Sequence, residues 1–126
     1  MSDAATAPNV LVVDDELQIR RFLRSGFELD GYSVSEAENG REAIRTATLR
    51  PTDLIILDLA LPDLDGSQVL ERIRSDHGSD PKVLVVSALV NASTTPKLEA
   101  YGNVQTLAKP FKIKELASRI QSMLAP

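Results

Sequence analysis

The chain has 126 residues, which is enough for one domain and too few for two. It carries 18 acidic and 14 basic residues, a net charge of −4 and no cysteine, so disulfides and thiolate metal sites are excluded. The acidic balance and the few aromatic residues argue against direct binding to nucleic acid. No apolar run is long enough to span a membrane.

The first residues, 1–8, are small or polar and lack the basic start and apolar run of a signal peptide. We interpret them as a disordered leader of a cytoplasmic protein, followed by one domain over residues 9–125. The first strand of this domain is predicted at residues 9–13, in the run NVLVV.

A helix is predicted after this strand, because apolar residues recur at helical spacing until an Asp-Gly pair ends the pattern. Its other side carries Arg20, Arg21 and Arg24, which we interpret as a face in contact with solvent.

Four more strands alternate with segments of helical period. The strands are predicted at residues 32–37, 53–57, 82–86 and 104–108. The helices are predicted after Asn39-Gly40, around Val69 to Ile73, as a short turn within residues 91–102, and from Ile113 to Leu124. Strand–helix repeats of this length predict a doubly wound α/β fold, with a parallel sheet covered by helices on both faces.

Polar side chains stand where four of these strands end. Asp14 and Asp15 follow the first strand, Asp58 the third, Ser87 the fourth and Lys109 the fifth. In an open parallel sheet these positions meet at the carboxyl edge, where ligands bind. Clustered carboxylates repel one another unless a hard divalent cation binds them, and a carboxylate is a competent nucleophile at phosphorus. The pattern therefore predicts phosphoryl transfer onto an aspartate.

The chain also resembles a known family, over about residues 9 to 125. The matching segments are VLVVDDE, LIILDLALPDLDG, VVSA and AKPF, in this order and at these strand ends. They are similar to the receiver domain of two-component response regulators. The resemblance implies a flavodoxin-like (βα)5 fold with strand order 2-1-3-4-5, and a phosphorylation switch rather than an enzyme.

The resemblance also assigns roles at the acidic cluster. Asp58 is the expected phosphoacceptor, on which Mg²⁺ or Mn²⁺ assists the transfer. The expected metal ligands are Asp15, Asp58 and the backbone carbonyl of Ala60, with Asp14 acting through water. Ser87 is the expected switch hydroxyl.

Lys109 is expected to bind the phosphoryl group, and its peptide bond to Pro110 is expected to be cis. By the same resemblance, three further positions bear on how the switch is read and how long the phosphoryl group lasts. Thr106 stands where the family often has an aromatic residue that reports the switch. Ala60 and Leu89 occupy positions that tune phosphoryl lifetime, and neither side chain can hold an attacking water, which predicts slow dephosphorylation.

The implied partners are a sensor histidine kinase or a histidine phosphotransfer protein as donor, and a downstream effector or output domain as recipient. Homodimerisation on phosphorylation is a further implication. The surface that changes is expected to comprise the short fourth helix, the fifth strand and the last helix. A docking site for the donor is the alternative interpretation of the arginines on the first helix. Direct contact with nucleic acid or membrane is not expected.

Two other functions compete with this one. A phosphatase of the aspartate type requires Asp-x-Asp at a strand end, but Leu59-Ala60 follows Asp58, and Asp63-x-Asp65 follows a loop. Pro62, Asp65 and Gly66 are interpreted as loop-forming. A receiver fold that works as a phosphorylation-independent interaction module is the remaining alternative. The one histidine, His77, has no partner motif, so a histidine phosphotransfer protein is not expected.

Overall fold

The computed structural model describes residues 7–76 and 81–125. His77 and most of the predicted leader lie outside the described residues. The elements alternate along the chain: β1 (Asn9–Val13), α1 (Leu17–Leu29), β2 (Ser33–Ala37), α2 (Gly40–Leu49), β3 (Leu54–Leu57), α3 (Gly66–Asp76), β4 (Lys82–Ser87), α4 (Thr95–Glu99), β5 (Val104–Ala108) and α5 (Ile113–Leu124). The predicted order of elements is confirmed, with strand ends shifted by one residue at β2, β3 and β4.

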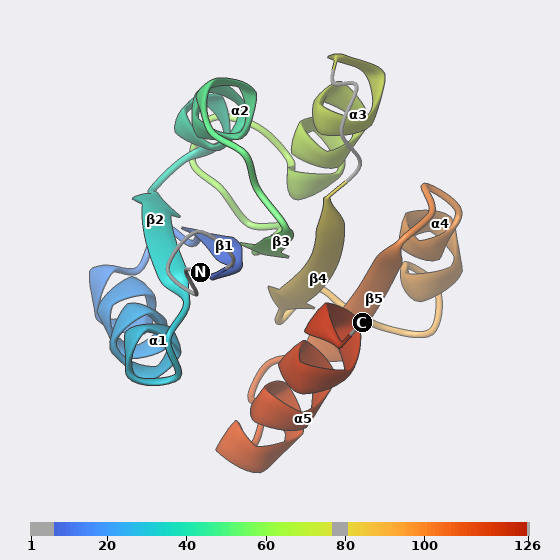
Figure 1. Cartoon of the computed structure of the whole chain (residues 1–126). Helices are drawn as coiled ribbons and strands as arrows, with labels where there is room; N and C mark the ends of the chain where they lie inside the picture. Colours follow the sequence, from blue (N-terminus) through green and yellow to red (C-terminus); the bar gives the residue numbers. More distant parts are fainter. Residues whose placement is uncertain (1–6, 77–80, 126) are drawn as a thin grey trace.

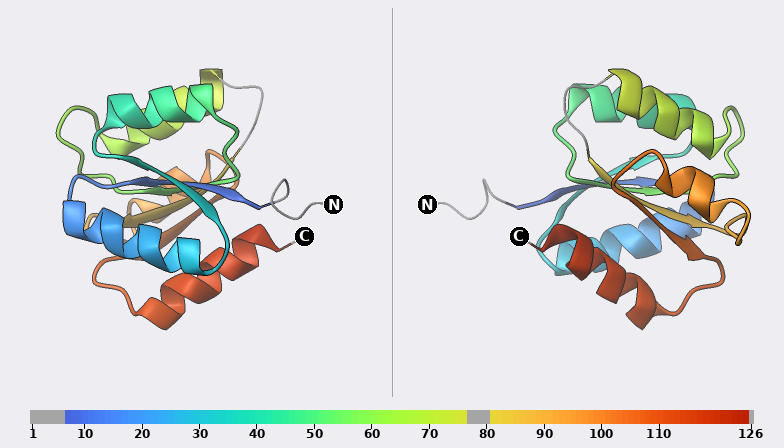
Figure 2. Two further views of the ribbon diagram at one scale, coloured as in Figure 1. Left: turned by 60° about the vertical axis from the view of Figure 1, so that its left-hand side comes forward. Right: turned by 90° about the vertical axis from the view of Figure 1, so that its right-hand side faces the viewer.

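The five strands form one parallel sheet in the order β2-β1-β3-β4-β5, as predicted. Helices α2, α3 and α4 cover one face of the sheet, and α1 and α5 cover the other (Figures 1 and 2). No helix within residues 7–76 and 81–125 is long and apolar enough to cross a membrane.

The central strands are apolar except at their ends, because both of their faces are covered. Their residues alternate between two cores, as the two-residue period of a strand requires. Leu11, Ile55 and Val83 pack toward α2, α3 and α4. The next residue on each strand packs toward α1 and α5. The two layers fix the strands in register and so fix the positions of the residues that follow them.

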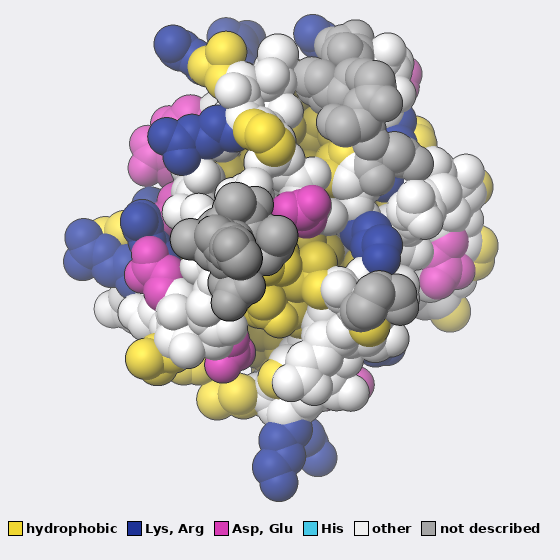
Figure 3. Space-filling model, viewed as in Figure 1, with side chains coloured by type: hydrophobic (Ala, Val, Ile, Leu, Met, Phe, Trp, Pro, Cys, Tyr) yellow, Lys and Arg dark blue, Asp and Glu magenta, His cyan; other side chains and the backbone are white. Residues whose placement is uncertain are grey.

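The carboxyl ends of the strands meet at one edge of the sheet, and the end of α5 lies at the opposite, amino edge (Figure 2). At the amino edge the Lys82 ammonium donates to the Met123 backbone carbonyl, which ties the start of β4 to α5. The face seen in Figure 1 shows apolar side chains toward its centre, with most of the lysine and arginine side chains around its rim (Figure 3).

The loop between β3 and α3 is held close to the end of β3. The backbone N–H of Gly66 donates to the Leu59 carbonyl at 3.0 Å. A Cβ on Gly66 would lie 2.6 Å from the Leu59 Cα and 2.8 Å from the Asp58 carbonyl oxygen, so only glycine fits. The Asp65 carboxylate accepts the Ser67 N–H at 2.8 Å and so supports the first turn of α3.

Asp63, in the same loop, contacts the start of α2 and not the Lys109 ammonium. Its carboxylate accepts the N–H groups of Gly40 and Arg41, at 2.7 and 3.0 Å, at the first turn of α2. Desolvation by itself raises the pKa of Asp63, but these backbone hydrogen bonds outweigh it and the pKa lies below its ordinary value. Asp63 therefore joins the loop to α2, and the Asp63-x-Asp65 spacing belongs to this structural role.

The prediction that Arg20 lies on a solvated face is wrong. Arg21 is exposed, but Arg20 retains only 7% of its accessible surface. The reason is that this side of α1 lies against β2, whose Glu36 accepts a hydrogen bond from the Arg20 guanidinium at 3.2 Å. Helical periodicity identifies a polar side of a helix, but not a polar neighbour that covers it.

Two glycine-to-alanine substitutions should change stability in opposite directions. Gly66→Ala should lower the free energy of unfolding by about 1–3 kcal/mol, because the new methyl group meets backbone atoms. Gly26→Ala in α1 should raise it by about 0.5–1 kcal/mol, because nothing lies within 4 Å and alanine favours a helix. Urea denaturation measures both. Equal effects of the two substitutions would contradict the close packing assigned to Gly66.

Candidate functional site

The backbone of the sheet places the predicted site residues. The ladder of backbone hydrogen bonds continues one residue past β1, β3 and β5. The N–H groups of Asp14, Asp58 and Lys109 donate to backbone carbonyls. The acceptors are those of Ala37 at 3.2 Å, Val13 at 3.0 Å and Ser87 at 3.1 Å, in this order. These bonds fix the directions in which the three side chains leave the sheet.

The side chains of Lys109, Asp14 and Asp58 meet at this edge. The Lys109 ammonium donates to Asp14 Oδ2 at 2.7 Å and to Asp58 Oδ2 at 2.9 Å. Asp14 and Asp58 are buried, with 4% and 6% of their surface exposed. Two buried carboxylates therefore share one counter-charge, and this group carries a net negative charge.

This arrangement changes how Asp58 and Lys109 titrate. Burial by itself raises the pKa of Asp58, but hydrogen bonds from Lys109, the Ala60 backbone and Ser87 outweigh it and the pKa lies below its ordinary value. Burial by itself lowers the pKa of Lys109, but the bonds to Asp14 and Asp58 outweigh it and the pKa is raised. At neutral pH Asp58 is therefore a carboxylate and Lys109 is an ammonium ion.

The remaining polar atoms of the cluster are held by backbone groups. Asp58 Oδ1 accepts the Ala60 N–H at 3.0 Å, and Asp14 Oδ1 accepts the Glu16 N–H at 2.9 Å. The Ser87 hydroxyl accepts the Leu89 N–H at 3.2 Å. The Ala60 side chain is exposed, and Leu89 is half exposed. The Lys109–Pro110 peptide bond is cis.

A second group of acidic side chains follows β1. One ligand oxygen each from Asp14, Asp15 and Glu16 lies within 4.8 Å of the others, and Asp15 and Glu16 are exposed. Carboxylate oxygens are the donors that hard divalent cations prefer, so this set fits Mg²⁺ or Mn²⁺. Within the described residues, Asp15 takes no part in the hydrogen bonds around Lys109.

The sequence-based prediction did not include Glu16. Its carboxylate lies 3.9 Å from the Lys109 ammonium as well as next to the other two acids. The unbroken run of three acidic residues after β1 was the only signal for it.

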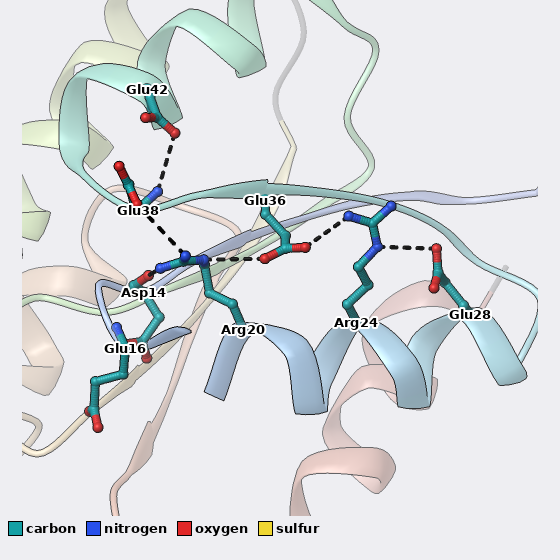
Figure 4. A network of polar contacts seen from close by, with 8 residues as sticks. All are labelled: Asp14, Glu16, Arg20, Arg24, Glu28, Glu36, Glu38 and Glu42. Atoms are coloured by element: carbon teal, nitrogen blue, oxygen red, sulfur yellow. Dashed lines mark hydrogen bonds and ion pairs between the residues drawn. The ribbon is translucent and has the colours of Figure 1, made fainter. Parts of the chain in front are cut away.

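Arg20 is a second residue that the sequence did not assign to this site. Its Nη1 donates to the Asp14 backbone carbonyl at 2.6 Å, and its Nε donates to Glu36 Oε1 at 3.2 Å. Glu36 Oε2 in turn accepts from Arg24 Nη1 at 2.8 Å (Figure 4). A chain of ion pairs thus runs along α1 and β2 and reaches the backbone of the site.

Thr106, at the position of the expected aromatic residue, makes polar contacts instead. Its hydroxyl lies 3.2 Å from that of Thr95 in α4, and its backbone carbonyl accepts from Arg119 Nη1 in α5 at 2.9 Å. These two contacts join α4, β5 and α5 at one residue.

A family model described as the response regulator receiver domain matches residues 10–121 of the chain. The chain belongs to this family. The family's receiver domains are signalling modules of two-component systems, so this assignment agrees with the resemblance found in the sequence.

Known proteins are similar to this receiver domain over nearly all of its length. KDP operon transcriptional regulatory protein KdpE of Escherichia coli is 43% identical, over 92% of this chain and 51% of that protein. Transcriptional regulatory protein ResD of Bacillus subtilis is 37% identical, over 97% and 50%. The chain thus spans about half the length of the curated relatives it matches. The structure of TrrA of Thermotoga maritima in complex with Mg(2+)-BeF is 30% identical, with a TM-score of 0.79, over 93% of this chain and 99% of that one.

Glu36→Gln should destabilise the receiver domain at neutral pH, by about 1–2 kcal/mol, because charge-assisted hydrogen bonds become neutral ones. Hydrogen bonds from Arg24, against the opposing effect of burial, and then from Arg20 lower the pKa of Glu36 from its ordinary 4.5. When the pKa of a carboxyl group is lower in the folded state than in the unfolded state, its ionisation stabilises the fold at pH values above the unfolded-state pKa. This stabilisation is lost as the pH falls through the folded-state pKa.

The difference in unfolding free energy between wild type and Glu36→Gln should therefore be full near pH 7 and shrink below the ordinary pKa of 4.5. Chemical denaturation at a series of pH values measures it. A difference that stays constant down to the acid limit of the native state would contradict the assigned ion pairs.

Proposed function

We propose that this receiver domain is switched by transfer of a phosphoryl group onto Asp58. The observation that supports this most is the sharing of the Lys109 ammonium between the two buried carboxylates Asp14 and Asp58. Such a net charge costs stability, and charge arranged at a cost in stability is typical of functional sites. The chain then acts as a phosphorylation switch and not as an enzyme that converts a separate substrate.

In the proposed reaction an Asp58 carboxylate oxygen attacks phosphorus. The lowered pKa of Asp58 keeps this oxygen deprotonated at neutral pH. The new P–O bond forms while the P–N bond of a phosphohistidine donor breaks, and the imidazole nitrogen leaves with the electron pair. The Lys109 ammonium, which contacts the Asp58 carboxylate before the reaction, then binds the phosphoryl oxygens instead.

The proposed metal ligands are Asp15, Asp58 and the Ala60 backbone carbonyl. Asp14 is proposed to act through water, as the family resemblance implies, while its carboxylate accepts hydrogen bonds from Glu16 and Lys109. A bound Mg²⁺ or Mn²⁺ neutralises charge on the phosphoryl group during transfer. The chemistry of the acidic donors supports this choice, and TrrA, a relative by structure, is known in complex with Mg(2+)-BeF.

Ser87 is the proposed switch hydroxyl, and the surface formed by α4, β5 and α5 is the proposed output. When a phosphoryl group attracts the Ser87 hydroxyl, the bond from the Leu89 N–H is given up. The loop before α4 then shifts, and the contact between Thr95 and Thr106 shifts with it. This is a two-state equilibrium biased by new contacts at one end.

The proposed donor is a sensor histidine kinase or a histidine phosphotransfer protein in the cytoplasm. The recipient is an effector or an output domain, or a second copy of the domain that pairs on phosphorylation. Relatives named as transcriptional regulators are about twice as long as this chain, which favours a DNA-binding output outside the receiver domain.

Incubation with Mg²⁺ and acetyl phosphate should add about 80 Da to the wild type, the mass of one phosphoryl group. Intact mass spectrometry measures this. Asp58→Asn should gain nothing, and Asp30→Asn, which changes an exposed acid at the other end of α1, should behave as wild type. An adduct that survives in Asp58→Asn would place the acceptor elsewhere.

If the wild type gains no mass and binds no Mg²⁺, the phosphorylation mechanism fails. A receiver fold that acts as an interaction module without phosphorylation would then remain. If Mg²⁺ binds without an adduct, a purified histidine kinase replaces acetyl phosphate as donor, and failure with both donors would reject Asp58 as the acceptor.

The phosphorylated form should lose its phosphoryl group slowly, over minutes to hours. The side chains of Ala60 and Leu89 are exposed beside the site but have no group that can hold an attacking water. Loss of the adduct with time, followed by mass spectrometry, measures the lifetime. Leu89→Glu should shorten it by supplying an acceptor for that water. A wild-type half-life of seconds would contradict this interpretation.

A further inference from the structure

Arg20 is a buried arginine that the proposed reaction does not use. Its side chain is 8% exposed, although it lies near the start of a surface helix. Burial of a guanidinium is costly unless every donor finds an acceptor. Its acceptors are the Asp14 carbonyl at 2.6 Å and Glu36 at 3.2 Å, with Glu38 within 3.8 Å. The position of this side chain is therefore tightly defined.

The contact with Asp14 is to its backbone and not to its carboxylate. The Asp14 carbonyl belongs to the planar peptide unit that leads into Asp15. A hydrogen bond that holds the carbonyl oxygen also fixes the plane of this unit, and with it the position of the Asp15 nitrogen and Cα. The Asp15 side chain itself is exposed, and within the described residues no hydrogen bond or ion pair holds it. Its direction therefore depends on the backbone that Arg20 fixes.

We infer that Arg20 is a positioning residue for the divalent cation, acting through the Asp14–Asp15 peptide unit. The inference rests on the proposed function, in which Asp15 is a direct metal ligand. The planar fork of the guanidinium reaches the Asp14 carbonyl and Glu36 together (Figure 4). Arg20 thus fastens the loop after β1 to the edge strand β2, which carries Glu36.

Arg20 also has a charge, and the charge alone would act in the opposite direction. A positive group near the acids repels a cation, so its removal would tighten cation binding if electrostatics dominated. The guanidinium contacts a backbone carbonyl, whereas the Lys109 ammonium contacts the carboxylates of Asp14 and Asp58, so the Arg20 charge acts from outside this group of side chains. The loss of position should therefore exceed the gain from removing the charge, and binding should weaken.

Three variants separate these effects. Arg20→Met removes both the charge and the fork. Arg20→Lys keeps the charge, but one ammonium cannot span the Asp14 carbonyl and Glu36 in the same geometry. Arg24→Met is the matched control, because Arg24 also pairs with Glu36, at 2.8 Å, but makes no contact with Asp14.

The measurement is the dissociation constant for Mg²⁺, from isothermal titration calorimetry on each folded protein, with its unfolding free energy determined in parallel. Loss of a group that orients a metal ligand weakens metal binding by about tenfold or more. We expect this in Arg20→Met and in Arg20→Lys, and an unchanged constant in Arg24→Met. If Arg20→Met does not fold, Arg20→Lys provides the same comparison.

Three outcomes would overturn the inference while leaving the proposed function intact. These are tighter binding in Arg20→Met, unchanged binding in both Arg20 variants with lowered stability only, and equal weakening in Arg24→Met. The first would make the charge dominant, the second would make Arg20 purely structural, and the third would spread the effect over the whole ion-pair chain. Absence of Mg²⁺ binding by the wild type would instead overturn the proposed function, and this inference with it.

Discussion

The Lys109 ammonium between Asp14 and Asp58 is the interaction on which the carboxyl edge of the sheet depends. Two carboxyl groups that are 4% and 6% exposed lie together at this edge, and their burial favours a positive charge close by. One lysine from the end of β5 supplies it, with bonds of 2.7 and 2.9 Å. The three strands that carry these residues must therefore end together, which the backbone bonds past β1, β3 and β5 ensure. One ammonium cannot neutralise two carboxylates, so the edge retains an affinity for further positive charge.

The fold could be predicted from the sequence because its central strands follow a simple rule. A strand covered on both faces has no polar side, so β1, β3 and β4 appear as unbroken apolar runs, and helices of amphipathic period lie between them. The residues of the site could be located for the same reason. A parallel sheet brings all carboxyl ends to one edge, so the residue after each strand is fixed once the strand is identified. The Asp58 carboxylate divides its two oxygens between Lys109 and Ala60, and this depends on side-chain rotation, which no sequence pattern contains.

Arg20 and Asp63 show where prediction from sequence stops. Periodicity assigns a polar residue on a helix to solvent. Arg20 is instead covered by β2, where its partner Glu36 lies 16 residues further along the chain. Asp63 has the spacing of a catalytic motif, but its carboxylate accepts from the first backbone N–H groups of α2. In both cases a contact between distant segments decides the role, and local pattern carries no information about such contacts.

Thr106 limits how strongly the proposed switch can change the position of α4. When an aromatic side chain rotates between buried and exposed positions, a large area of apolar surface is buried or exposed. A threonine has only one stiff rotatable bond and one hydroxyl, so its rotation changes much less. Its contact with Thr95 contributes about 1 kcal/mol, as a neutral hydrogen bond does, and a tenfold shift of a two-state equilibrium requires about 1.4 kcal/mol. The threonine pair alone therefore cannot move α4 decisively. In the proposed switch, the larger share would come from contacts of Ser87 and Lys109 with the phosphoryl group. Arg119, which donates to the Thr106 carbonyl at 2.9 Å, would then couple a displacement of β5 to α5.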